Sequence, residues 1–285
     1  MSYQVINSHF TEFYENEERD MNHILKRNNV NIIGSGEQTI VLGHGFGCDQ
    51  NIWQFITPYF ENNYKIILYD YVGSGHSDKT QYDKKRYSDL HGYAKDLEEI
   101  LDELKINDAI FVGHSVSSMI GVLASIHNPK YFKKMVLISP SPRYINDGNN
   151  YYGGFDKQDI NEILTFMEMN FLGWASANAS ALMDNPDKPA LAEQLKDTLS
   201  SEDPGIMKDF ARATFLTDCR KEVSLVTIPT LIIQCSVDSI VPVEVAHYLN
   251  DNIKNSSLKI IEARGHYPHL SMPKITAECI VEFVS

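Results

Sequence analysis

Short apolar runs alternate with longer amphipathic stretches through most of the chain. Strand-length apolar runs occupy residues 39–42, 64–69, 109–112, 135–138, 230–234 and 258–261. Helix-like patterns occupy residues 51–60, 88–104, 116–128, 243–252 and 274–284, and residues 24–33 suggest a hairpin. Strands that alternate with helices are typical of a mostly parallel sheet covered by helices on both faces. The pattern therefore predicts an α/β fold.

This alternation stops between residues 141 and 219, where helical patterns continue without a convincing strand. The predicted helices cover residues 156–171, 173–183, 188–198 and 204–216. We interpret residues 141–219 as a helical lid inserted into a core made of residues 23–140 and 220–285. Residues 1–22 are polar and acidic and show no period that would bury a face, so they are expected to form a loosely attached extension.

Composition narrows the classes of function. The 285 residues suit one large domain with an insertion, and the net charge of −13 disfavours nucleic acid and anionic membranes as partners. No apolar run approaches the length of a membrane span. The four cysteines are scattered and the N-terminus has no signal-peptide pattern, which predicts reduced thiols in a cytoplasmic protein.

The stretch VGHSVSSMIG, residues 112–121, places Ser115 between an apolar strand and a helical run. A nucleophile on such a tight strand-turn-helix elbow needs small residues two positions before and after it. Gly113 meets this requirement, and Ser117 stands where the G-x-S-x-G pattern has its second glycine. The alternative is that Ser115 only caps the helix, a position that serine favours.

A serine nucleophile also needs amide groups that bind the oxyanion of the transition state. One N–H would come from Val116, and another from Phe46 in His44-Gly45-Phe46-Gly47, which follows the first core strand. We expect His44 to support this loop rather than to act as a base. The alternative for the His-Gly pair is a plain tight turn.

The base and its orienting acid should follow the serine in the order acid, then histidine, each after a strand. Asp238 follows the run 230–234, and His266 follows the run 258–261, so both order and placement fit. An isolated aspartate could equally form a turn or a helix cap. The sequence also holds His114, His127, His247 and His269, but it shows no third ligand beside His269, so neither a metal nor a cofactor is expected.

Six stretches carry a resemblance to a known family: HGFGCDQNIW (44–53), LYDYVGSGHSD (68–78), VGHSVSSMIG (112–121), SPSPRYIND (139–147), YYGGF (151–155) and ARGHYPHLS (263–271). From about Met21 onward the chain resembles α/β-hydrolases of the group that contains the bacterial sigma-B regulator RsbQ and the plant strigolactone and karrikin receptors. GFGCDQ, YYGGF and GHYPH are closer to the bacterial regulator, whereas Ser117 is similar to the plant form.

This resemblance implies a triad of Ser115, Asp238 and His266 beneath a V-shaped lid of four helices. It also implies a narrow apolar pocket lined by Phe46, Val116, Phe155, Trp174, Phe215 and Ile240. In such proteins the pocket hydrolyses or senses a small hydrophobic ligand, and the bacterial member works with a PAS-domain, PP2C-type phosphatase in the stress response.

Two functions remain open at this point. The chain is expected to be either a serine hydrolase of a small hydrophobic ester or lactone, or a ligand sensor with slow or single turnover that acts through a protein partner. Both use the same residues, so the sequence does not separate them. An aspartate-based dehalogenase or epoxide hydrolase is disfavoured because the elbow residue is a serine.

Overall fold

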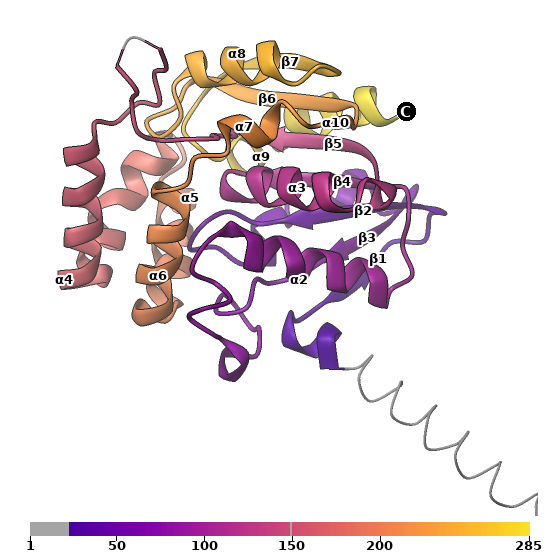
Figure 1. The fold of residues 1–285 in the computed structure, drawn as a ribbon, viewed down its shortest axis with the longest axis horizontal. Helices are drawn as coiled ribbons and strands as arrows, with labels where there is room; N and C mark the ends of the chain where they lie inside the picture. Colours follow the sequence, from indigo (N-terminus) through magenta and orange to yellow (C-terminus); the bar gives the residue numbers. More distant parts are fainter. Residues whose placement is uncertain (1–22, 149) are drawn as a thin grey trace, which may run out of the picture.

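The computed structural model describes residues 23–148 and 150–285, so the predicted extension of residues 1–22 lies outside the described residues. Seven strands form one sheet in the order β1-β3-β2-β4-β5-β6-β7 (Figure 1). β1 (Asn31–Ile33) pairs antiparallel with β3, and every other pairing is parallel. The remaining strands are β2 (Gln38–Gly43), β3 (Tyr64–Leu68), β4 (Ala109–His114), β5 (Phe132–Ile138), β6 (Thr230–Val237) and β7 (Ser256–Arg264).

Helices pack on both faces of this sheet, as the sequence predicted. They are α2 (Leu90–Glu103), α3 (Val116–His127), α8 (Val243–Asn252), α9 (Pro268–Ser271) and α10 (Pro273–Val284). α2 begins where the Asp89 side chain accepts the His91 N–H. α3 is buried along nearly its whole length because it packs against β4, β5 and α2. The central strand β4 is buried on both faces, which places the core around it.

Two sequence predictions at the start of the core are wrong. Residues 23–27 are helical, and β1 pairs with β3, so residues 24–33 do not form a hairpin. A short apolar run fits a helix and a strand equally well, and here the positive φ of Asn29 ends the helical turn. The predicted helix 51–60 consists instead of two 3₁₀ turns, Gln50–Trp53 and Thr57–Tyr59.

The helical insertion between β5 and β6 confirms the predicted lid. It contains α4 (Lys157–Met183), α5 (Pro189–Ser201), α6 (Pro204–Phe215) and the short α7 (Arg220–Val223). α4 breaks at Asn170, whose side chain accepts the Gly173 N–H and so starts a second helical segment. The lid therefore has the four main helical segments that the sequence predicted, and Figure 1 shows them gathered beside one end of the sheet.

The lid helices are amphipathic rather than uniformly apolar, since they cover a pocket on one side and meet solvent on the other. In the part of the chain that the structure describes, no helix has the length and apolar character needed to cross a membrane. The lid covers the carboxyl ends of the core strands, where the loops after β2, β4, β6 and β7 meet.

Candidate active site

Ser115 occupies a strained turn between β4 and α3. Its backbone has φ 54° and ψ −119°, a conformation that L-residues rarely adopt, and its side chain makes no capping bond to the helix. The turn is tight because a Cβ on Gly113 would lie 2.8 Å from the Ser117 carbonyl oxygen. The helix-cap alternative therefore does not describe Ser115: the fold strains the backbone here and leaves the hydroxyl free for another partner.

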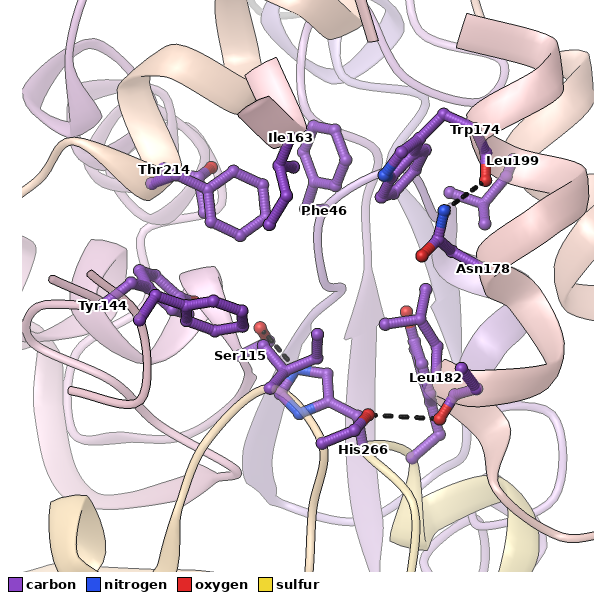
Figure 2. Close-up of a pocket in the computed structure, with 16 residues that line it drawn as sticks. Phe46, Ser115, Tyr144, Ile163, Trp174, Asn178, Leu182, Leu199, Thr214 and His266 are labelled. Carbon is purple, nitrogen blue, oxygen red and sulfur yellow. Dashed lines mark hydrogen bonds between the residues drawn. The ribbon is translucent and has the colours of Figure 1, made fainter. Parts of the chain in front are cut away.

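That partner is His266. The Ser115 Oγ lies 2.8 Å from His266 Nε2, and His266 Nδ1 lies 2.8 Å from Asp238 Oδ2 (Figure 2 shows Ser115 and His266). The loops after β4, β6 and β7 thus bring together the three residues that chain order singled out. The side chains of His266 and Asp238 are almost fully buried, and Ser115 is only 5% exposed.

The Asp238 carboxylate is held ionised by its surroundings. Burial alone would raise its pKa, but the charge and hydrogen bond of His266 and the amides of Ile240 and Val241 bring the pKa below its ordinary value. Those two amides donate to Oδ1 at 2.8 and 3.1 Å. Asp238 can therefore orient the imidazole and stabilise the imidazolium that forms when His266 takes a proton.

Gln234 is a member of this site that the sequence analysis missed. Its buried Nε2 donates to Asp238 Oδ2 at 3.1 Å and to the Val241 carbonyl at 3.0 Å. The only signal was one polar residue at the end of an otherwise apolar strand. Gln234 fixes the acid loop against β6, so the carboxylate faces His266.

The amides of Phe46 and Val116 have the environment that an oxyanion site requires. Among the residues that the structure describes, neither N–H donates to a protein acceptor. Val116 is the first residue of α3, where the helix dipole also favours negative charge. Both amides are therefore free to bind an oxyanion next to Ser115.

His44 supports the loop that carries Phe46, as expected. The Tyr71 N–H donates to His44 Nε2 at 3.1 Å, so the proton lies on Nδ1, which donates to the Gly45 carbonyl at 2.9 Å. Burial lowers the pKa of His44, so the ring stays neutral. The Gly45 carbonyl and the Phe46 N–H belong to one peptide group, and this bond fixes its orientation.

A cavity of about 260 Å³ lies between the lid and the core, with Ser115 and His266 in its wall (Figure 2). Five of the residues predicted to line it do so: Phe46, Phe155, Trp174, Phe215 and Ile240. Val116 does not, because its side chain is buried in the core. The prediction missed the polar side chains Tyr144, Asn178, Thr214 and Ser239. Asn178 and Thr214 lie on lid helices whose rotation sequence pattern does not fix, and Tyr144 and Ser239 lie in loops after β5 and β6.

The side chains of His114, His127, His247 and His269 do not belong to the triad. His114 donates from Nε2 to the His266 carbonyl at 2.9 Å, and His269 packs against Trp53. Burial lowers the pKa of both rings, that of His269 to about 3. His127 lies beside Glu98 on the far end of α3, and His247 is exposed on α8. Within residues 23–148 and 150–285, no three His, Cys, Asp or Glu side chains are placed to hold a metal.

The lid is bonded to the loops that carry the acid and the base. The His266 N–H donates to the Leu182 carbonyl at 2.9 Å, and the Ser239 hydroxyl donates to the Ala181 carbonyl at 3.1 Å. Gly265 has φ 89°, and a Cβ there would lie 1.9 Å from the Met183 carbonyl oxygen. The end of α4 therefore rests directly on the loop that holds His266.

A serine, a histidine and an aspartate on three loops above a parallel sheet, under a helical lid, define the arrangement of an α/β serine hydrolase. Comparison with known proteins agrees, since residues 38–273 match the model of the alpha/beta hydrolase fold family. The chain belongs to the α/β-hydrolase family, and the prediction that it is a hydrolase of this family is confirmed.

Similar proteins show more closely where the chain lies within this family. The chain is 40% identical to karrikin insensitive 2 receptor IA of Petunia hybrida, over 93% of this chain and 97% of the relative. It is also 40% identical to strigolactone esterase RMS3 of Pisum sativum, over 89% and 95%. A hydrolase of known structure from Oleispira antarctica superimposes with a TM-score of 0.90 at 41% identity, covering 92% of this chain and 96% of that one. The predicted kinship with the plant receptors is therefore confirmed.

Proposed function

We propose that this chain hydrolyses a small hydrophobic ester or lactone through an acyl-enzyme on Ser115. The observation that carries the proposal is the hydrogen-bonded series from Ser115 Oγ through His266 to Asp238, set in the wall of a mostly apolar cavity. The names of the similar plant proteins, two of which are strigolactone esterases, support the same chemistry.

In the first half of the reaction, His266 Nε2 takes the proton of Ser115 as the oxygen attacks the substrate carbonyl carbon. The oxygen of the tetrahedral intermediate accepts the Phe46 and Val116 N–H groups. His266 then gives its proton to the departing alkoxide, and the acyl group stays on Ser115. Water attacks this ester in the second half by the same path, which releases the acid and restores the serine.

The cavity limits the substrate. Its volume of about 260 Å³ is at the low end for ligand sites, so a compact ester or lactone fits and a long-chain lipid does not. Its aromatic walls favour an apolar body, while Asn178 and Thr214 offer polar contacts on the lid side. The scissile carbonyl must lie at the opposite end, beside Ser115.

A serine-directed fluorophosphonate tests this proposal. We expect it to label Ser115 and to abolish hydrolysis of p-nitrophenyl acetate, because phosphonylation removes the nucleophile. The Ser115→Ala protein should neither react nor hydrolyse the ester, while Ser118→Ala, which removes a buried hydroxyl of α3 outside the triad, should do both. Labelling of another residue, or hydrolysis that survives Ser115→Ala, would refute the proposal.

A second candidate function is ligand sensing with slow or single turnover. It is favoured by the similarity to proteins named karrikin insensitive 2 receptors and by the burial of Ser115 under a lid bonded to the His266 loop. Rapid-mixing kinetics separate the two: an enzyme continues to release product after the first turnover, whereas a sensor gives one burst equal to the protein concentration.

We further propose, from the resemblance to the bacterial regulator, that such a sensor would act on a PAS-domain, PP2C-type phosphatase in a stress-signalling pathway. The test is co-purification of this chain with a phosphatase of that architecture from the same cells, with and without prior treatment by fluorophosphonate. Binding that depends on the state of Ser115 would support this role. Failure to recover any such phosphatase would contradict it.

A further inference from the structure

Three buried hydroxyls form a series behind the oxyanion loop. The Tyr69 hydroxyl donates to Tyr71 at 3.0 Å, the Tyr71 and Ser117 oxygens lie 2.6 Å apart, and Ser117 Oγ donates to the His44 carbonyl. All three side chains are essentially inaccessible to solvent. None of them touches the cavity, so substrate binding does not explain the series.

The direction of these bonds follows from their end point. A carbonyl only accepts, so the single Ser117 proton must point to His44, and Ser117 must accept from Tyr71. Tyr71 in turn accepts from Tyr69. Burial raises the pKa of both tyrosines, so each hydroxyl keeps its proton. Hydrogen bonds in such a series polarise one another, so the bonds from Tyr69 and Tyr71 strengthen the last bond, which Ser117 donates.

The position of the His44 carbonyl affects the orientation of the oxyanion loop. It precedes Gly45, which carries no side chain because a Cβ there would lie 2.5 Å from His114 Nδ1. A glycine leaves the backbone free to rotate just before the peptide that carries the Phe46 N–H. The His44 imidazole fixes that peptide from one side, so the peptide before Gly45 needs its own anchor.

We infer that Ser117, supported by Tyr71, is a positioning residue that aims the Phe46 N–H at the oxyanion. This inference rests on the proposed hydrolase function. Ser117 lies two residues after Ser115, so the N-cap and first turn of α3 together carry the nucleophile, the Val116 amide and the anchor of the loop that supplies the Phe46 amide. The hydroxyl thus has a task that the glycine of a G-x-S-x-G elbow could not perform.

The test compares Ser117→Ala with Ser118→Ala in the full chain. Ser118 is a matched control because it lies in the same turn and its buried hydroxyl donates to the Gly113 carbonyl at 3.0 Å, away from the oxyanion loop. With p-nitrophenyl acetate, we expect Ser117→Ala to lower kcat about 10- to 50-fold and to leave KM within about twofold, since only the transition state uses the amide. Ser118→Ala should keep both values within about twofold.

An alkyl trifluoromethyl ketone gives a second readout, because it forms a tetrahedral alkoxide on Ser115. Its affinity should fall in Ser117→Ala by the same factor as kcat/KM, which a general loss of stability would not produce. A kcat equal to that of Ser118→Ala, or a change confined to KM, would overturn the inference.

Two further arms keep the result interpretable. If Ser117→Ala does not fold, Tyr71→Phe decides: a kcat at least threefold lower with unchanged KM supports the inference, and an unchanged kcat overturns it. Fluorophosphonate labelling of Ser115 is measured in every variant. If the unaltered chain shows no Ser115-dependent hydrolysis, the proposed function fails; if it does and Ser117→Ala matches it, only the present inference fails.

Discussion

Replacing Asp238 by asparagine is the change that probes the site most directly. Four N–H donors converge on the carboxylate: Ile240 and Val241 on Oδ1, and His266 and Gln234 on Oδ2. An asparagine keeps the shape but turns one of the two acceptors into a donor. Whichever way the amide is oriented, its NH₂ group faces two N–H groups.

The structure decides which orientation is adopted. If the NH₂ faced the backbone of Ile240 and Val241, two buried amides would lose their acceptor, at about 1–3 kcal/mol each. If it faces His266, the imidazole can respond by moving its proton from Nδ1 to Nε2. The second orientation costs less, but the Nε2–H then points at Ser115 and cannot accept its proton. We therefore expect kcat to fall about 10³- to 10⁴-fold, or about 4–5.5 kcal/mol of transition-state stabilisation.

The assay is steady-state hydrolysis of p-nitrophenyl acetate, with Ser115→Ala as the baseline and Asp184→Asn as the control. Asp184 is a surface acid paired with Arg264 beside the same loop, and its replacement should keep kcat within about twofold. KM should change little in Asp238→Asn because Asp238 does not line the cavity. A kcat within tenfold of the unaltered chain would show that Asp238 is not needed to orient His266.

Three further predictions concern stability and specificity. Burial, and secondarily the charge of His266, lowers the pKa of His269 to about 3 from its ordinary 6.5. Between these values the unfolded chain binds a proton at His269 that the folded chain does not. The free energy of unfolding should therefore fall by about 1.4 kcal/mol per pH unit as the pH drops from 6.5 toward 3. When the free energy of unfolding is measured with urea at pH 7, 5.5 and 4.5, His269→Phe should lack this dependence on pH. The same dependence on pH in the variant and the unaltered chain would contradict the prediction. Gly265→Ala should lower the free energy of unfolding by about 2–4 kcal/mol and kcat by at least tenfold, because the new Cβ would overlap the Met183 carbonyl. Gly148→Ala is the control for backbone strain alone, since Gly148 also has a positive φ but a Cβ there would have no neighbouring atom within 4 Å. An equal loss in both glycine variants would exclude the overlap as the cause. Phe215→Leu should enlarge the cavity and raise kcat/KM for p-nitrophenyl hexanoate over acetate about 3- to 10-fold, and an unchanged ratio would show that this wall does not limit the acyl chain.

The layout of the sheet and the lid could be predicted because each depends on local pattern. Parallel strands buried on both faces appear as short apolar runs, and Asp238 and His266 follow such runs in the order that the elbow requires. The helical stretch without strands marks the lid for the same reason. The prediction of a hairpin at residues 24–33 was wrong because an apolar run of that length does not distinguish a helix from a strand.

The missed residues share a different cause. Ser117 acts through His44, 73 residues earlier in the chain, so no local spacing reveals it. Gln234 acts through Asp238, which is four residues later but lies beyond the end of β6, where the strand pattern no longer places side chains. Asn178 and Thr214 face the cavity only because of how α4 and α6 are rotated in the lid, and this rotation depends on packing between helices. Sequence pattern thus locates the loops that carry chemistry, but not the contacts that adjust them.

The bond from the His266 amide to the Leu182 carbonyl has a consequence for protein engineering. Exchanging lids between hydrolases is a route to new substrate ranges, and the turn after α4 is a convenient place to join two parent chains. In this chain such a joint would alter the last turn of α4, whose Ala181 and Leu182 carbonyls accept hydrogen bonds from the acid and base loops and whose Met183 carbonyl packs against Gly265. A chimera should therefore keep the last turn of α4 with the core, or exchange it together with residues 264–266.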